Sequence, residues 1–417
     1  MQTGNMTRLP AGSPQLLRQL NSAHVLRAIR THGPISRADL AKTIGLSKPT
    51  VNEVVEGLLG EGTVLESEPN GAERPLRPGR RARLLRFRAD LGHVLGIDIG
   101  ANKLLVVVAD LNGDVVASER RPVRARERAD AAALLKHAQS AATTALAAAG
   151  TQRSLLQAVG VGTPGVVDPA TGRLSLAPQL GGWEGLPLGR RLQRSFPCPV
   201  LVENEVHLSV LAERWRGAAQ GIDDALFVQA GYGIGGGLLV GGRLYRGANG
   251  AAGEIGYLPF AEDWSPRDGL GPFEHAAGGS AYARHGRRAA AARGGRRLLE
   301  LAGGDPDAID AETVFAAAAE GNAAAASILD TLVARLARGI AAAAIVVDPQ
   351  TVIVGGGLSR AGEALLRPLE RALADLVPIP PQVVLSDLGE EAVALGAVRL
   401  AVQTVENRLF GIAAEAV

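Results

Sequence analysis

The chain has 417 residues, 47% of them hydrophobic and 21% charged, which is enough material for two or three domains with sizeable cores. Its apolar runs are too short for a membrane-spanning helix, its first residues do not resemble a secretory signal, and a single cysteine excludes an internal disulfide. We therefore expect a cytoplasmic protein that does not bind membranes, with Cys198 as a small core residue.

Charge is distributed unevenly along the chain. Residues 1–90 hold 14 Lys+Arg and 8 Asp+Glu, a net charge of +6, whereas the rest holds 30 and 34, a net charge of −4. Seven arginines fall within residues 74–88, which contain no acidic residue. Such a stretch favours binding to a polyanion. The two parts of the chain are therefore expected to have different partners.

The first residues have the pattern of a helix-turn-helix. Residues 14–32 carry apolar residues at helical spacing, and a second helix is expected from the capping residue Ser36. A glycine turn at Gly45 precedes a third helix that opens at Ser47. The N-terminal end of that helix normally enters the major groove, where Asn contacts adenine and Lys contacts guanine or phosphate. The candidate DNA-binding residues in this helix are Ser47, Lys48, Pro49, Thr50 and Asn52.

Residues 63–68 and 82–88 are expected to form the two strands of a wing. Three arginines in the joint between them, Arg77, Arg80 and Arg81, are candidates for an adjacent minor groove, where the negative potential favours arginine. Residues 1–90 thus predict a winged helix-turn-helix DNA-binding domain. The alternative is a small helical interaction module with a solvated basic loop. Capping, spacing and charge all favour DNA binding.

Residues 91–417 have the pattern of an α/β domain. A two-residue turn at Asn112-Gly113 is expected to join two strands, and a helix is expected between Asp130 and Ala149. The other strands are expected at 94–100, 103–111, 158–162, 200–202, 351–354 and 382–385. The other helices are expected to be one that reaches Trp215 and two at 359–376 and 390–407.

Residues 231–257 predict a ligand site. Glycines after the apolar run 225–228 let backbone N–H groups approach an anion or a nucleotide closely. Glu254 stands among small residues, where its carboxylate can accept hydrogen bonds from hydroxyls. A tight hairpin followed by a surface loop is the alternative interpretation.

Five separated motifs occur in order: GIDIGANK (96–103), GVGTPGVVDPATG (160–172), LVENEV (201–206), residues 231–257, and VIVGGGLS (352–359). Together they resemble the ROK family, a group of bacterial sugar kinases and sugar-responsive repressors that share an actin-like ATPase fold. The resemblance implies a two-lobed α/β domain over the second part of the chain, with the last helix packing back on the first lobe. The family's kinases lack the long N-terminal extension that this chain has.

The resemblance also implies a sugar pocket. Its expected effector-binding residues are Gly165, Asn204, Glu205, Glu254, Tyr257 and Glu274. In the family's kinases an Asp acts as the general base at the position that Glu205 holds here. Because a misplacement of roughly 1 Å costs about a hundredfold in rate, we assign no catalytic residue and treat Glu205 as a vestigial base.

The nucleotide loops and the metal site of the family are altered. Ala101 and Asn102 replace a glycine and a threonine, and Tyr232 replaces a small hydroxyl residue, so we expect neither ATP nor Mg²⁺ to bind. The vestigial nucleotide-loop residues are Asp98, Gly100, Gly231, Gly233 and Gly356. The family's four zinc-ligand positions hold Tyr257, Ser265, Arg267 and Pro272. Since a structural zinc needs about four N or S ligands, we expect no metal and no cofactor.

The leading hypothesis is a DNA-binding transcriptional regulator, a repressor by the family's habit, with a sugar or sugar derivative as effector. A homodimer or a dimer of dimers on a double-stranded operator is expected, because such modules read two half-sites. The alternative is an ATP-dependent sugar kinase of the hexokinase or glucokinase type with a regulatory DNA-binding extension. A third possibility is a sensor that signals only through protein partners.

Overall fold

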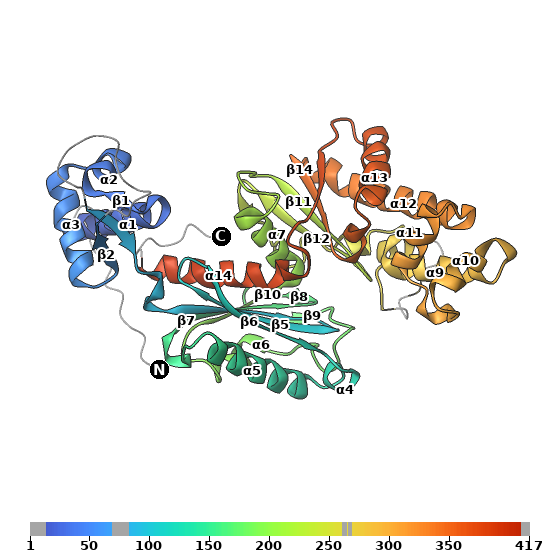
Figure 1. Ribbon diagram of the computed structural model, residues 1–417, viewed down its shortest axis with the longest axis horizontal. Coiled ribbons are helices and arrows are strands. Elements are labelled where there is room, and N and C mark those ends of the chain that lie inside the picture. Colours follow the sequence, from blue (N-terminus) through green and yellow to red (C-terminus); the bar gives the residue numbers. More distant parts are fainter. Residues whose placement is uncertain (1–13, 69–82, 261–264, 266–268, 410–417) are drawn as a thin grey trace.

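The computed structural model describes residues 14–68, 83–260, 265 and 269–409. They form an N-terminal winged-helix domain and two α/β lobes (Figure 1). The predicted wing arginines Arg77, Arg80 and Arg81 and the former zinc position Arg267 lie outside these described residues.

The N-terminal domain confirms the predicted helix-turn-helix and wing. Ser36 caps the second helix, because its Oγ accepts the Asp39 N–H at 3.1 Å, and Ser47 caps the third through the Thr50 N–H at 3.3 Å. Gly45 ends the second helix in the left-handed conformation, with φ 68°. The domain contains α1 (Pro14–His32), α2 (Arg37–Ile44) and α3 (Lys48–Gly60), with a sheet ordered β1 (Ile35–Ser36), β3 (Leu84–Phe87), β2 (Val64–Ser67).

The winged-helix core buries the predicted apolar faces of α1 and α3, including Val25, Ile29 and Val55. Leu17 and Leu20, which share the helical spacing of α1, are instead exposed. Phe87 of β3 packs against this core and also against a core of the first lobe. The wing strand is therefore a direct connection between the two domains.

The first lobe is a five-stranded mixed sheet with helices on both faces. α5 (Ala131–Ala148) packs on one face and α14 (Ala392–Leu409) packs on the other (Figure 1). The strand order is β10 (Val200–Asn204), β7 (Leu156–Thr163), β4 (His93–Ile99), β5 (Lys103–Asp110), β6 (Val115–Pro122). Parallel pairing of β4, β7 and β10 brings their carboxyl ends to one edge.

The predicted hairpin between β5 and β6 is present, but the predicted turn length of two residues is wrong. The connection spans residues 111–114, because Asp110 Oδ1 accepts the N–H groups of Asn112 and Asp114, each at 2.9 Å. A register shift between Val108 and Ala109 accompanies this side-chain turn.

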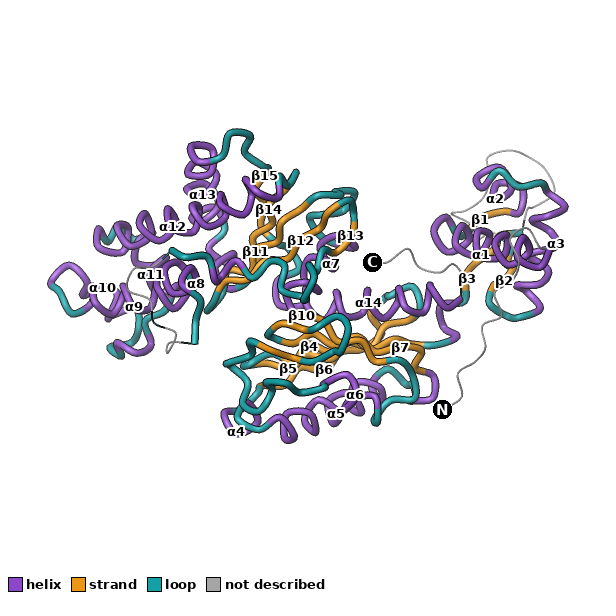
Figure 2. Tube along the Cα trace, turned by 180° about the vertical axis from the view of Figure 1, so that it is seen from behind, coloured by secondary structure: helices purple, strands orange, loops and turns teal. Residues whose placement is uncertain are grey.

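The second lobe is a five-stranded sheet covered by helices, among which α12 and α13 pack together (Figure 2). Its sheet is ordered β13 (Arg243–Leu244), β12 (Ile234–Val240), β11 (Ala225–Ala230), β14 (Thr351–Gly355), β15 (Gln382–Leu385). The other helices of this lobe are α8 (Pro272–Ala277), α9 (Gly279–Ala290), α10 (Arg296–Leu301), α11 (Ala311–Ala319), α12 (Ala323–Val347) and α13 (Glu363–Leu376). The start predicted for α13 at residue 359 is wrong, since a 3₁₀ helix, Gly357–Ala361, comes first. None of the described helices is long and apolar enough to cross a bilayer.

Glycines allow the backbone of α14 to lie in direct contact with the backbones of β7 and of the helix that follows β10. A Cβ on Gly160 of β7 would lie 2.0 Å from the Ala397 carbonyl oxygen, and one on Gly396 would lie 1.9 Å from the Leu208 carbonyl oxygen. Leu208 belongs to α7 (Glu205–Arg216), the helix that follows β10. The packing therefore fixes α14 against α7 as well as against the sheet.

Candidate functional site

A cleft of about 460 Å³ lies between the two lobes. Its lining includes the end of β4, the N-terminus of α7, the turn between β11 and β12, and the start of α8. All the residues predicted for effector binding or as vestigial nucleotide loops line it: Asp98, Gly100, Gly165, Asn204, Glu205, Gly231, Gly233, Glu254, Tyr257, Glu274 and Gly356. The fold thus brings together residues that lie as far as 258 positions apart in the sequence, between Asp98 and Gly356.

Asn204 caps α7 and connects it to the turn between β7 and β8 (Val166–Val167). Its Oδ1 accepts the N–H groups of Val206 at 2.7 Å and His207 at 3.1 Å, and its Nδ2 donates to the Gly165 carbonyl at 2.9 Å. These bonds use the oxygen and leave one Nδ2 hydrogen for a ligand. Asn204 therefore holds the helix end and the Gly165 turn in one arrangement.

Glu205 is the first residue of α7 and lines the cleft. Burial, together with the nearby charges of Asp98, Glu254 and Glu274, raises the pKa of its carboxyl to about 7, although the charge of Lys103 acts to lower it. Within the described residues no side chain donates a hydrogen bond to this carboxyl. Close to neutral pH, Glu205 is thus able both to accept and to donate a hydrogen bond to a hydroxyl.

Glu274 is held against the glycine turn between β11 and β12. Its Oε1 accepts the Ile234 N–H at 2.9 Å and its Oε2 accepts the Gly271 N–H at 2.7 Å. A Cβ on Gly233 would lie 2.3 Å from Glu274 Oε1, so Gly233 makes room for this carboxylate. Burial raises the pKa of Glu274 and of Glu254, and the charge of Glu274 raises the pKa of Glu254 further.

Asp98 is almost completely buried at the end of β4. Lys103 Nζ lies 3.1 Å from its Oδ2, yet neither Asp98 oxygen receives a hydrogen bond of good geometry within the described part of the chain. Burial raises the pKa of Asp98, while the charge of Lys103 lowers it. The sequence motif contained Lys103, but its pairing with Asp98 was not predicted.

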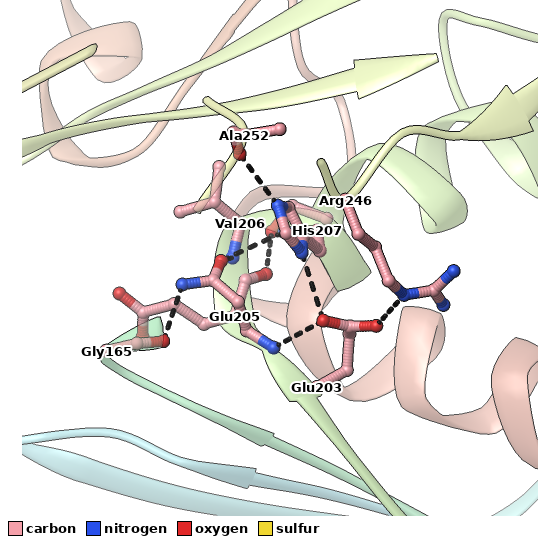
Figure 3. A network of polar contacts seen from close by, with 9 residues as sticks. Gly165, Glu203, Glu205, Val206, His207, Arg246 and Ala252 are labelled. Atoms are coloured by element: carbon pink, nitrogen blue, oxygen red, sulfur yellow. Dashed lines mark hydrogen bonds and ion pairs between the residues drawn. The ribbon is translucent and has the colours of Figure 1, made fainter. Parts of the chain in front are cut away.

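A second polar group was missed entirely by sequence reasoning (Figure 3). Glu203 Oε1 lies 3.0 Å from His207 Nδ1, and Glu203 Oε2 accepts from Arg246 Nε at 2.5 Å. His207 Nε2 lies 2.9 Å from the Ala252 carbonyl oxygen, so both ring nitrogens face acceptors. Although burial raises the pKa of Glu203, His207 and Arg246 hold it below its usual value.

This network joins the two lobes next to the cleft. Glu203 lies in β10 of the first lobe, next to its last residue, whereas Arg246 and Ala252 belong to the second-lobe loop that leads to Glu254. The spacing of Glu203 and His207, four residues apart at a helix start, was the available sequence signal.

The two tyrosines of the cleft are open to solvent. Tyr232 is 71% exposed and Tyr257 is 44% exposed, so neither ring fills the cavity.

In the described residues no group of three or more His, Cys, Asp or Glu has the arrangement of a metal site. Three of the four former zinc positions, Tyr257, Ser265 and Pro272, are described, and none of these side chains is a metal ligand of the required N or S type.

The predicted DNA-contacting end of α3 lies on the surface. Ser47, Lys48, Pro49 and Asn52 are exposed and Thr50 is half-buried, with its hydroxyl 2.8 Å from that of Ser47. This is the placement that a recognition helix requires.

Comparisons with known proteins agree with this architecture. The model of the ROK family matches residues 94–404, and the model of the MarR family matches residues 19–70. A xylose repressor from Caldicellulosiruptor bescii is 27% identical over 397 residues, which are 94% of this chain and 97% of that protein. A putative xylose repressor from Caldicellulosiruptor sp. (strain Rt8B.4) is 32% identical over 247 residues, 59% of this chain and 60% of that protein.

Two crystal structures are similar to the fold. A ROK family glucokinase from Streptomyces griseus, in complex with glucose and AMPPNP, has a TM-score of 0.65 at 30% identity and covers 75% of this chain and 100% of its own. A ROK family transcriptional regulator, a homolog of the E. coli MLC protein, has a TM-score of 0.73 at 23% identity over 95% of this chain and 98% of its own. With the family model matching more than half of its length, the chain belongs to the ROK family, and it carries a MarR-type winged helix-turn-helix at its N-terminal end.

Proposed function

We propose that the chain is a DNA-binding transcriptional regulator, a repressor, whose two-lobed domain binds a sugar as effector. The observation that carries the proposal is the presence, in one chain, of an exposed recognition helix at α3 and an interlobe cleft rich in hydrogen-bond acceptors. Repression, rather than activation, is supported by the alignment of this chain with a xylose repressor. Dimers reading two half-sites about one helical turn apart are the expected form on the operator.

The cleft suits a polyhydroxyl ligand. The carboxyl groups of Glu205, Glu254 and Glu274 come from three different elements of the chain and face one cavity. Several acceptors placed around one cavity recognise several hydroxyl donors at once, which is the chemistry of a sugar.

Helix α14 supports coupling between the cleft and the DNA-binding domain. Val393 near its start lines the cleft, and Val405 near its end belongs to the core against which Phe87 of the wing packs. A sugar that binds the closed lobes more tightly than the open lobes would shift the position of α14 and of the winged-helix domain. Such a differential affinity is required for any regulatory effect.

We propose further that the cleft does not catalyse phosphoryl transfer, because Glu205 is one methylene longer than the Asp base of the kinases. A sugar kinase remains the second candidate function, since Glu205 has a pKa of about 7, a value suited to a general base. A coupled assay for ADP release with Mg-ATP and a panel of hexoses separates the two. We expect no turnover above that of Glu205→Ala, whereas sugar-dependent turnover that this substitution abolishes would establish the kinase.

The regulator itself is tested by fluorescence anisotropy of the full-length protein on DNA fragments from upstream of its own and neighbouring genes. We expect one fragment to bind in preference to random DNA of equal length, and one sugar to shift that affinity several-fold at fixed salt. Equal affinity for all fragments, with no response to any sugar, would overturn the proposal.

A further inference from the structure

Four carboxyl groups gather in the cleft and repel one another. Asp98, Glu254 and Glu274 each raise the pKa of Glu205 through their charge, and all four side chains line the same cavity. We call these four residues the carboxylate quartet. A further anion placed among them would meet the same repulsion.

The quartet has more acceptors than the protein has donors for them. Both oxygens of Asp98 lack a hydrogen bond of good geometry, and within the described residues no donor reaches the carboxyl of Glu205 or Glu254. Glu274 accepts two backbone N–H groups and keeps free lone pairs on each oxygen. The quartet therefore offers free acceptors to a ligand that brings hydrogen-bond donors.

The cations on the described lining of the cleft are already paired with carboxylates. Lys103 lies 3.1 Å from Asp98, and Arg360 pairs with Glu390, which also pairs with Arg120. A phosphate beside the quartet would have to compete with these carboxylates for each cation.

The glycine turn between β11 and β12 is also occupied by an internal anion. Its Ile234 N–H donates to Glu274, and its Gly231 N–H donates to the Gly233 carbonyl at 3.0 Å. These two backbone donors of the turn are of the kind that binds a phosphate in a glycine-rich loop, and both already have acceptors within the protein.

We infer that the effector is a sugar without an anionic group, and that phosphorylated sugars and sugar acids are rejected by the carboxylate quartet. The inference rests on the proposed function, because it names the class of sugar that the proposed effector site takes. A neutral sugar supplies hydroxyl donors and adds no charge, whereas each phosphate adds about 1.5 to 2 negative charges at neutral pH.

Isothermal titration calorimetry on the full-length chain at pH 8 and fixed salt tests this directly. The probes are pentoses, hexoses, N-acetylhexosamines and disaccharides, each compared with its own phosphate and, for glucose, with glucuronate. At pH 8 Glu205 is ionised, because its pKa is about 7. We expect the neutral form of the best ligand to bind at least tenfold more tightly than its phosphate.

The outcomes separate this inference from the proposed function. A sugar phosphate that binds as tightly as its neutral parent, or more tightly, overturns the inference and leaves a sugar-responsive regulator intact. If no sugar of either kind binds while specific DNA binding persists, the proposed effector fails and the inference fails with it.

Removing one charge shows whether the quartet causes the discrimination. Glu205→Gln keeps the side-chain shape, and we expect it to reduce the ratio of neutral-sugar to phosphate affinity at least threefold. Glu254→Gln gives a second, independent removal of charge that leaves the pair of Lys103 with Asp98 intact. Glu184→Gln removes an exposed carboxylate that does not line the cleft and is expected to leave the ratio unchanged. An unchanged ratio in both quartet variants would overturn the inference.

Discussion

Arg30 of the winged-helix domain forms an ion pair with Glu406 of α14, the last helix in the described part of the chain. Both side chains are mostly buried, and the same Glu406 carboxylate also accepts from Arg399 at 3.0 and 3.1 Å. Arg30 lies over the ring of Phe87, 5.9 Å from its centroid. One carboxylate thus holds two guanidinium groups together where the DNA-binding domain meets the first lobe.

Because Glu406 is shared by two arginines, we expect substitutions of Glu406 and of Arg30 to lower the free energy of unfolding by different amounts. Glu406→Gln leaves Arg30 and Arg399 facing each other without a counter-charge, so we expect it to lower the free energy of unfolding by about 1–3 kcal/mol. Arg30→Gln leaves the pair between Glu406 and Arg399 intact and is expected to cost less than about 1 kcal/mol. Urea unfolding followed by circular dichroism measures both, and equal losses would contradict the shared-carboxylate arrangement.

Local sequence signals predicted the secondary structure well because they act through neighbouring residues. The caps Ser36 and Ser47 each lie three residues before the N–H group that their hydroxyl accepts. The turn after Asp110 is longer than predicted, because Asp110 Oδ1 accepts the N–H groups of Asn112 and Asp114, although Gly113 keeps its place in the turn with φ 84°.

The contacts between residues far apart in the sequence could not be predicted in the same way. The family resemblance selected the residues of the cleft, but it did not show that Gly233 makes room for Glu274, or that Arg246 reaches Glu203. Those pairs are 41 and 43 positions apart in the sequence, and only the three-dimensional fold brings them together.

The raised pKa of Glu205 predicts how its removal changes stability with pH. Its folded-state pKa of about 7 lies above the ordinary value of 4.5, so the stability of the native protein falls as pH rises from 4.5 through 7. Glu205→Gln removes that loss. We expect the variant to gain about 1–3 kcal/mol in free energy of unfolding, relative to the native protein, between pH 5 and pH 8.

Urea unfolding of both proteins at the two pH values provides this measurement in the absence of ligand. Glu184→Gln, at an exposed position, is the matched control and should follow the native protein at both pH values. A variant that gains nothing at pH 8 would mean that Glu205 ionises without penalty in the folded state.

Because β7 and α14 are in backbone contact, adding one methyl group to Gly160 is expected to destabilise the protein strongly. A Cβ on Gly160 would lie 2.0 Å from the Ala397 carbonyl oxygen, and backbone cannot move aside as a flexible side chain can. We expect Gly160→Ala to lower the free energy of unfolding by about 1–3 kcal/mol, measured by urea unfolding. Gly57→Ala is the control: nothing lies within 4 Å of its added Cβ in α3, so it should be neutral or slightly stabilising.

The exposed N-terminal end of α3 predicts two distinguishable effects on DNA binding. Lys48 carries a charge and is expected to contact phosphate or guanine, whereas Asn52 is neutral and suited to adenine. If Lys48 contacts phosphate, Lys48→Ala weakens binding to all sequences and reduces the slope of log affinity against log salt by about 1. Asn52→Ala should cost about 1–3 kcal/mol on the specific site alone and leave the salt slope unchanged.

Anisotropy titrations on the operator and on random DNA, each at several salt concentrations, separate these effects. Lys136→Ala is the control, because Lys136 is exposed on α5 of the first lobe, away from the winged-helix domain, and its loss should change neither affinity nor slope. An Asn52→Ala variant that binds operator and random DNA as the native protein does would place the recognition surface elsewhere. The DNA would then have to be read by another part of the winged-helix domain, because the positively charged part of the sequence is residues 1–90, with a net charge of +6.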